Sequence, residues 1–171
     1  MASALAGKFI ALDLQDNPSL VFAACVLHDI GKIALWWKLE GEYEELLAES
    51  RRGQTPLRVL ERNQLGFDHA EVGGELLRHW NFPPELVAAV RYHHDPAGTE
   101  EHRRIATYTC LGDKLAWFMG FGAGDPALEL SGRTEALHQL GLDASRIPHY
   151  MARCFFALRE MPILLEVHLA A

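Results

Sequence analysis

The sequence is short of cysteine and of basic residues, and each shortage excludes a class of protein. Its three cysteines (Cys25, Cys110 and Cys154) are scattered and never spaced as CxxC, which indicates buried free thiols in a reducing compartment. Lysine and arginine total 16 against 23 aspartates and glutamates, so the formal net charge is -7. So acidic a chain is not expected to bind nucleic acid nonspecifically or to adhere to an anionic membrane.

The chain also lacks the segments that direct a protein into or across a membrane. No apolar run approaches about 18 residues, the length of a transmembrane helix, so we expect no membrane span. The first residues, 1–5, carry neither the charged start nor the apolar core of a signal peptide. These absences predict a soluble, cytoplasmic protein.

Strand-like patterns are missing as well. The sequence has no alternation of period two over the length of a strand, no internal repeat and no low-complexity tract. Apolar residues recur at helical spacing instead, and they predict an all-α fold in a single domain, 1–171. The predicted helices cover 2–14, 19–30, 40–52, 56–65, 69–80, 83–94 and 101–121, a short stretch that ends near 140, and a last helix that includes 147–158.

Helix ends and helix faces are predicted by particular residues. Gly66 is expected to end one helix, and Asp68 followed by Glu71 three residues later is a capping-box variant that begins the next. Helical spacing places Leu5, Phe9 and Leu12 on one face of the first helix, with Ile10 at its edge. It places Phe155, together with Cys154, on the inward face of the last helix. Trp36 and Trp37 are expected in the core or on a surface that contacts a partner.

A histidine and an aspartate, His28 and Asp29, follow directly on the apolar run 20–26. Charged residues are seldom buried unless they are paired or bind a metal, so this pair needs a partner. One possibility is a helix end, where His28 lies near free carbonyls, Asp29 accepts backbone N–H bonds and Gly31 breaks the helix. The other is that imidazole and carboxylate bind one divalent metal ion.

Four further residues have the side chains that a metal site uses, and each also has a structural explanation. His69 is expected in the first turn of a helix, where it either faces solvent or offers a neutral imidazole to a metal. His93 and His94 are expected at a helix C-terminus, which stabilises cationic histidine without any metal. Asp113, at the edge of an apolar helix face, is either a ligand or a buried partner of Lys114 or an arginine.

The order His-Asp, His, His-His, Asp resembles the HD superfamily of metal-dependent phosphohydrolases. The residues between these positions look like its HDOD (HD-related output domain) branch. The resemblance spans residues 1–120 and leaves 121–171 as a helical extension at the C-terminus. The segments that carry it are Val26-Leu27-His28-Asp29-Ile30-Gly31-Lys32, Gly66-Phe67-Asp68-His69-Ala70-Glu71-Val72-Gly73-Gly74, Trp80-Asn81-Phe82-Pro83 and His93-His94.

The resemblance implies an all-α HD-type fold and two neighbouring sites for divalent metal ions, with Fe, Mn or Mg as the expected metals. In it, His28, Asp29 and Asp113 form the first metal site, and Asp29 bridges to the second. His69, His93 and His94 make up that second site. Asp29 and Lys32 are the expected catalytic residues, Lys32 as a point charge facing a phosphate oxygen. A lysine at a helix C-terminus, favoured by the helix dipole alone, is the structural alternative for Lys32.

Two departures from the family pattern shape the expected function. The HD pattern includes a histidine upstream of the His-Asp pair, and none precedes His28, so we expect a fragment that lacks N-terminal helices. Pro96 and Ala97 follow Asp95 where cyclic di-GMP phosphodiesterases carry Gly-Tyr-Pro, so cyclic di-GMP hydrolysis is disfavoured.

The expected function is therefore that of a signal-transduction output module, which retains much of a metal site and acts through signalling protein partners. An active metal-dependent phosphohydrolase, acting on a nucleotide or another small phosphoester, is the alternative. We also expect a homo-oligomer, because Leu5, Phe9, Leu12, Trp36, Trp37 and the tail 163–165 offer apolar surface.

Overall fold

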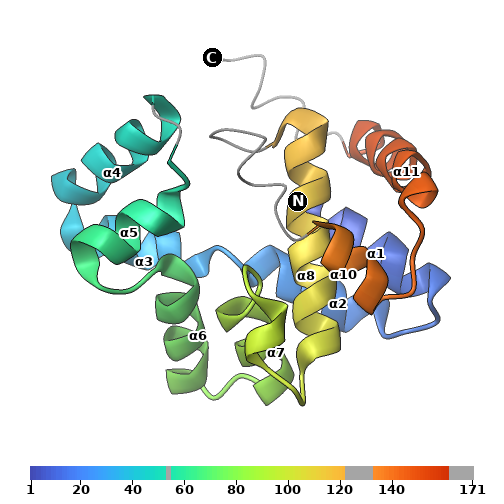
Figure 1. Ribbon diagram of the computed structural model, residues 1–171, viewed down its shortest axis with the longest axis horizontal. Coiled ribbons are helices and arrows are strands. Elements are labelled where there is room, and N and C mark those ends of the chain that lie inside the picture. Colours follow the sequence, from blue (N-terminus) through green and yellow to red (C-terminus); the bar gives the residue numbers. More distant parts are fainter. Residues whose placement is uncertain (53–54, 122–132, 162–171) are drawn as a thin grey trace.

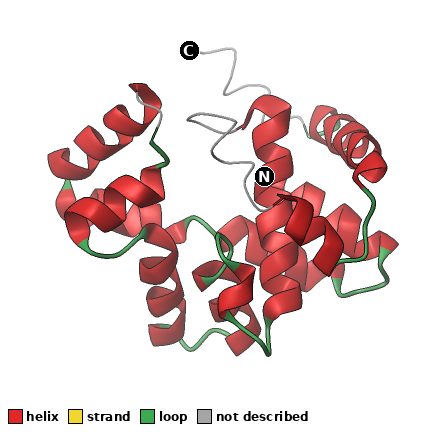
Figure 2. Cartoon of the chain, viewed as in Figure 1, coloured by secondary structure: helices red, strands yellow, loops and turns green. Residues whose placement is uncertain are grey.

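A computed structural model describes residues 1–52, 55–121 and 133–161, and within these ranges the chain is helical and has no strand (Figure 2). The predicted all-α fold is confirmed. The helices are α1 (Ala2–Asp13), α2 (Pro18–Leu27), α3 (Ile30–Leu39), α4 (Gly41–Arg52), α5 (Leu57–Leu65), α6 (His69–His79), α7 (Pro84–Arg91), α8 (Arg103–Ala116), α10 (Arg133–Gln139) and α11 (Ile147–Arg159), with short helical turns η1 (Pro96–Gly98), η2 (Trp117–Phe121) and η3 (Ala144–Arg146).

The helices form two neighbouring groups (Figure 1). Each group packs around its own cluster of buried side chains. The largest group joins α1, α2, α8, α10 and α11, and includes Ile10, Leu111 and Leu115, none of which is exposed. A smaller group joins α3, α4 and α5 around Leu35 and Leu46. Full burial of one such aliphatic side chain contributes roughly 1.5–3 kcal/mol, so both groups stabilise the fold.

The stretch 18–39 is the part of the described chain that is long and apolar enough to cross a membrane, by length and composition only. An 18-residue segment of it has a mean hydropathy of 1.5, and 33% of that segment is buried. The core helix of a soluble protein can have the same length and composition. Here the helix is interrupted between α2 and α3, where His28 and Asp29 lie.

The predicted helix ends are largely confirmed. Gly66 follows α5 with a φ of 83°, a left-handed conformation that glycine adopts without a steric penalty. Asp68 accepts from the backbone N–H of Glu71 at 3.0 Å, and the Glu71 carboxylate accepts from the Asp68 N–H, which completes the capping box. α7 ends at Arg91, earlier than predicted, and so leaves His93 and His94 beyond the helix.

The exposure of several side chains differs from the prediction or decides between its alternatives. Phe155, predicted to face inward, is 49% exposed, because the closely packed face of α11 is that of Cys154. Leu12 is 44% exposed, whereas Leu5 and Ile10 of the same helix are buried. Trp36 and Trp37 are exposed, so they lie on the surface, which is the second of the two places predicted for them. The predicted apolar tail, 163–169, lies outside the described residues.

Helices α3 and α6 cross so closely that the contact requires glycine. A Cβ atom on Gly31 would lie 1.9 Å from the carbonyl oxygen of His69 and 2.8 Å from the backbone nitrogen of Gly73. This crossing brings the start of α6, and with it His69, beside the break that carries Asp29.

Candidate metal centre

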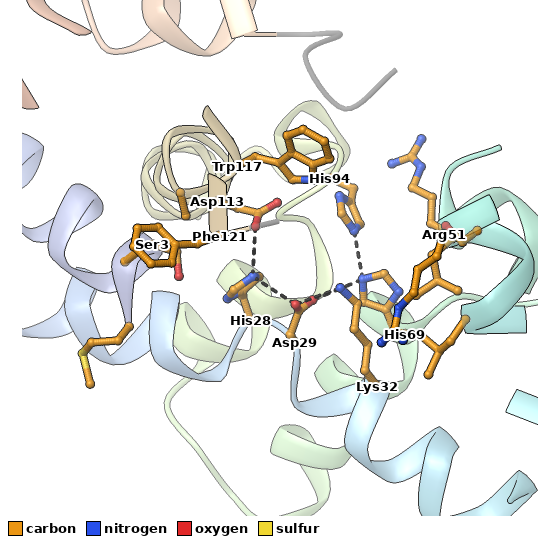
Figure 3. Close-up of a pocket in the computed structure, with 17 residues that line it drawn as sticks. Ser3, His28, Asp29, Lys32, Arg51, His69, His94, Asp113, Trp117 and Phe121 are labelled. Atoms are coloured by element: carbon orange, nitrogen blue, oxygen red, sulfur yellow. Dashed lines mark hydrogen bonds and ion pairs between the residues drawn. The ribbon is translucent and has the colours of Figure 1, made fainter. Parts of the chain in front are cut away.

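The six predicted ligand residues come from four separate places in the chain and form one cluster (Figure 3). In it, three histidines lie near Asp29, His94 lies near one of these, His69, and Asp113 lies near another, His28. His28 and Asp29 lie between α2 and α3, His69 begins α6, His93 and His94 follow α7, and Asp113 lies in α8.

Five short distances describe the cluster. His28 Nε2 lies 3.4 Å from Asp29 Oδ2 and 3.3 Å from Asp113 Oδ1. Asp29 Oδ1 lies 3.4 Å from His69 Nε2 and 4.0 Å from His93 Nε2. The Nε2 atoms of His69 and His94 are 2.9 Å apart.

Three of the imidazoles are oriented by an acceptor on their Nδ1 side. His28 Nδ1 lies 2.6 Å from the carbonyl oxygen of Cys25, and His93 Nδ1 lies 2.7 Å from that of Val90. His69 Nδ1 lies 2.6 Å from Oε2 of Glu61. Because a carbonyl oxygen can only accept, Nδ1 carries the proton in His28 and His93, and in the neutral ring Nε2 presents its lone pair to the cluster.

Buried atoms at the centre of the cluster have no hydrogen-bond partner in the described part of the chain. These are Nε2 of His28, Nε2 of His93 and Oδ1 of Asp29. An unsatisfied buried polar atom costs about 1–3 kcal/mol, so three together at one point indicate a group that completes them.

The donor set and its spacing fit a divalent metal ion. Two donors bound at ~2.0–2.1 Å to one ion are about 2.9–3.4 Å apart for right-angled to tetrahedral arrangements. The separations of 2.9, 3.3 and 3.4 Å within the cluster are in that range. Two triads have their ligand atoms within 4.8 Å of one another: His69, His93 and His94, and His28, Asp29 and His93.

The second triad differs from the set that the resemblance implied. His93 belongs to both triads, whereas Asp113 joins the cluster through His28. The structure thus places His93 between the two groups of ligands, beside the bridging position that the resemblance assigned to Asp29.

The charged residues of the cluster shift one another's pKa values. Burial alone would lower the pKa of His28, but Asp29 and Asp113 outweigh it and raise that pKa to about 9. Burial likewise disfavours the charged form of Asp29, yet His28 and Lys32 hold the pKa of this carboxyl well below its usual range. A bound cation would take the place of the proton on His28, because a metal ligand must be deprotonated.

The pKa values of the two histidines after α7, His93 and His94, are shifted in the opposite direction from that of His28. Burial, together with His28 and His69, lowers the pKa of His93 to about 3, and burial with His93 places the pKa of His94 well below its usual range. Both are therefore neutral imidazoles at neutral pH, the form that binds metal.

Lys32 lies at the wall of the cluster. Its Nζ donates to Oδ2 of Asp29 at 2.8 Å, and this contact, with burial opposing it, raises the pKa of Lys32. The ammonium group is thus close to the site but already has a carboxylate partner.

Glu61 and Tyr43 are two residues of the site that sequence reasoning missed. Glu61 has no exposed surface and accepts from the backbone N–H of His69 at 3.0 Å and from the hydroxyl of Tyr43 at 2.5 Å. The sequence of α5 does indicate a buried role for Glu61, because helical spacing places it on the same face as Leu57 and Leu60. A carboxylate in that position needs a partner.

A cavity of about 400 Å³ opens directly above the cluster. Asp29 reaches it, with 38% of its side chain exposed even though its Oδ1 is buried. Figure 3 shows Ser3 and Phe121 on one side of this cavity and Arg51 on the other. The cluster is therefore accessible to a small molecule.

Part of this sequence is similar to known proteins. A sequence model of the HDOD domain matches residues 1–96. An uncharacterized protein of Treponema pallidum (strain Nichols) is 25% identical over 99 residues, which cover 55% of this chain and 18% of that protein.

Solved structures share the fold. A chain named "Putative signal transduction protein" from Marinobacter aquaeolei has a TM-score of 0.72 at 23% identity, covering 90% of this chain and 35% of its own. The response regulator MmoQ from Methylococcus capsulatus has a TM-score of 0.62 at 25% identity, and the match covers 88% of this chain and 57% of that one. A chain named "Putative phosphohydrolase" from Shewanella amazonensis has a TM-score of 0.68 at 22% identity, and the match covers 89% of this chain and 56% of that one. This chain thus spans less than two thirds of each.

Proposed function

The chain belongs to the HDOD domain family, and from that membership we propose that it is a regulatory output module of signal transduction with a divalent-metal site. The proposed ligands are His28, Asp29, His69, His93, His94 and Asp113. The observation that supports the metal site is a set of three buried atoms without a hydrogen bond in the described part of the chain, Nε2 of His28, Oδ1 of Asp29 and Nε2 of His93, in one cluster of close ligand atoms.

The types of donor atom indicate which divalent ions the site would bind. Imidazole nitrogens with carboxylate oxygens, and no thiolate, suit Fe or Mn better than a soft metal ion, while Mg favours oxygen donors. Such an ion can polarise a phosphoester and activate water. The chain's own residues would position the ligands, through the carbonyl oxygens of Cys25 and Val90 and the carboxylate of Glu61.

Two features support the regulatory role: membership of the HDOD family and the apolar side chains exposed on α3. The family is an output-domain family, and one structural relative is named a response regulator. Exposed apolar side chains on α3, among them Ile33 and Trp37, offer a surface for signalling protein partners. The three free, buried cysteines fit a reducing compartment, so we place the protein in the cytoplasm.

Hydrolysis of a small phosphoester is the second candidate function. The observation that favours it is the cavity above the cluster, which gives a substrate access to Asp29 and Lys32. In this function Lys32 would place its positive charge against a phosphate oxygen, and Asp29 would be shared between Lys32 and the metal ligands.

Metal content tests the proposal. Protein purified without added chelator should contain Fe or Mn by elemental analysis, and Asp29→Ala should lose most of it while its circular dichroism stays helical. The reason is that Asp29 is the carboxylate that lies near His28, His69 and His93. Glu49→Ala, which removes an exposed carboxylate of α4, is the matched control and should keep its metal.

Two results would contradict the metal site: wild-type protein that takes up neither Fe nor Mn, or Asp29→Ala protein with the wild-type metal content. Turnover of bis(p-nitrophenyl) phosphate by the Mn-loaded wild type, absent from Asp29→Ala, would favour the hydrolase over a purely regulatory module.

A further inference from the structure

We propose that the corner between α3 and α4 binds an arginine side chain from a basic segment of a signalling protein partner. Trp36 and Trp37 contact the guanidinium group, and Glu40 and Glu44 balance its charge. This inference rests on the proposed regulatory role, because it names the chemistry of the partner that the exposed face of α3 would contact. No metal ligand takes part in it.

A separate cavity of about 400 Å³ lies where α3 ends and α4 begins, at one edge of the molecule (Figure 1). Two indole rings, two carboxylates and Gly41 line it, and none of these residues lines the cavity above the metal-ligand cluster. Trp36 is 50% exposed and Trp37 is 78% exposed. Two tryptophans exposed around one hollow indicate a surface that binds another molecule.

The carboxylates at this cavity are not balanced by a cation. Glu44 accepts from Nε1 of Trp36 at 3.1 Å, which holds its carboxylate beside that indole ring. Glu40 is exposed, and its side chain has neither an ion pair nor a hydrogen bond in the described part of the chain. Lys38 is close in sequence but does not line the cavity, because it lies on the opposite side of α3 from Trp36. The cavity therefore matches a cationic group.

The backbone at Glu40 supports a role for its side chain. Glu40 has a φ of 43° and a ψ of -121°, a conformation that residues with a Cβ atom rarely adopt. Glycine would adopt it without a steric penalty, yet the glycine of this corner comes one residue later, at Gly41. Strained residues of this kind are concentrated at functional sites, so the strain agrees with a carboxylate that is needed beside the two indole rings.

A guanidinium group suits these surroundings better than the ammonium group of lysine. Its flat face can stack on an indole ring while its N–H groups donate to a carboxylate. An ammonium group is a compact, strongly hydrated charge, so it gains less from an aromatic face.

The surface beside the cavity indicates that the arginine belongs to a protein. Ile33 lies one turn before Trp37 on the exposed face of α3, and it can contact an apolar side chain next to the arginine. The partner segment is therefore both basic and amphipathic. The same corner of a second copy of this chain is acidic as well, so it cannot supply the cation.

Calorimetric titration with a short amphipathic peptide of alanine, leucine and arginine tests the inference. The same peptide with citrulline, a neutral residue of the same shape, is titrated in parallel. Wild-type protein should bind the arginine peptide about tenfold more tightly, because one hydrogen bond between charged groups contributes roughly that factor. The double variant Glu40→Gln/Glu44→Gln should lose this preference. Trp37→Leu, which stays apolar but has no aromatic face, should reduce it.

Glu45→Gln/Glu49→Gln is the matched control. It removes the same net charge from exposed positions of α4 that do not line the cavity, so it should keep the preference for arginine. Wild-type protein that binds the two peptides equally, or neither of them at millimolar concentration, would overturn the inference. Equal losses in the two double variants would overturn it too, because they would indicate attraction by net charge alone.

Glu40→Gly separates binding from folding. The midpoint of its urea denaturation should be unchanged or higher, because glycine relieves the strain of the positive φ. Its affinity for the arginine peptide should nevertheless fall. A Glu40→Gly variant that binds this peptide as tightly as wild type would contradict the role of the carboxylate and with it the inference.

Two measurements test other occupants of the cavity. Tetramethylammonium has no N–H donor, so it should bind more weakly than the arginine peptide. Equal affinity would assign the cavity to a small ammonium ligand and overturn the inference. Light scattering should give Glu40→Gln/Glu44→Gln the mass of wild type. A lower mass for this variant than for Glu45→Gln/Glu49→Gln would assign the cavity to a second copy of the chain, against the inference.

Elemental analysis of the same samples separates this inference from the metal centre. Protein that prefers the arginine peptide through Glu40 and Glu44 but contains neither Fe nor Mn would support the inference and contradict the metal centre. Metal-containing protein without that preference would contradict the inference alone.

Discussion

At the scale of single residues, the helix-end and metal-ligand interpretations of the histidines are compatible. α2 ends at Leu27 and α7 at Arg91, and the last carbonyls of a helix lack an intrahelical partner. His28 and His93 each donate Nδ1–H to the carbonyl three residues earlier. The helix end thus aims each Nε2 at the cluster, and one side chain serves both purposes.

His69 is the first residue of its helix, so no carbonyl of a preceding turn can accept from its Nδ1. The carboxylate of Glu61 is the group that orients this ring instead. We expect Glu61→Gln to lower metal affinity by about 10–100-fold, because second-shell partners of ligating histidines have effects of that size. The pKa of Glu61 is lowered, against the effect of burial, by its contacts with His69 and Tyr43, so the group that orients His69 is an ionised carboxylate. Competition titration with a chelator measures the change.

Tyr43→Phe is the control for Glu61→Gln. It removes one hydrogen bond to Glu61 and leaves the carboxylate on His69, so metal affinity should fall less than in Glu61→Gln. Equal metal affinity in wild type and Glu61→Gln would show that Glu61 serves the fold alone.

At the scale of elements, the site depends on how closely α3 approaches α6. Gly31, two residues after Asp29, lies against the backbone of His69 and Gly73. A larger residue would push apart the two elements that carry Asp29 and His69, and no rotation of a side chain can relieve a contact between backbones.

We expect Gly31→Ala to lower the free energy of unfolding by about 2 kcal/mol or more, within the range for overpacked sites. It should also reduce metal uptake, because the Asp29 to His69 distance of 3.4 Å has to increase. Urea denaturation and elemental analysis measure the two effects.

Gly41→Ala is the matched control for Gly31→Ala. Gly41 begins α4 with no atom within 4 Å of an added Cβ, so its substitution should be neutral or slightly stabilising. If Gly31→Ala were as stable as Gly41→Ala, the close crossing of α3 and α6 would not matter to the fold.

At the scale of the whole molecule, apolar side chains remain on the surface of α3. Ile33 is 63% exposed and Trp37, one turn later on the same face, is 78% exposed. Leu5, which the sequence suggested as part of an exposed apolar face, is buried against the core of α1 and α8. We therefore expect self-association to use the exposed face of α3, with Ile33 and Trp37, and not Leu5.

We expect the chain to form a dimer or larger assembly in solution, because monomers seldom leave clustered apolar side chains exposed. Trp37→Glu should shift it toward monomer, since a carboxylate at that position is costly to bury. Trp80→Glu, at a half-exposed tryptophan directly after α6, is the control and should leave the assembly intact. Light scattering after size exclusion measures the mass, and a monomeric wild type would contradict the expectation.

The sequence by itself determined the helical fold, most helix ends and the residue types of the site, because these depend on near neighbours in the chain. The cap at Asp68 and the left-handed Gly66 are complete within a few residues. The order of histidines and aspartates likewise indicated a metal-binding family before any contact was known.

Only the tertiary structure decided which side chains meet. The hydrogen bond from Tyr43 to Glu61 joins α4 to α5, and the cavity joins Arg51 of α4 to Phe121 beyond α8. The exposure of Trp37 and of Leu12 depends equally on which helix covers them. The physical reason is that helical periodicity shows that a face is apolar, whereas burial and pairing are set by distant elements that pack against that face.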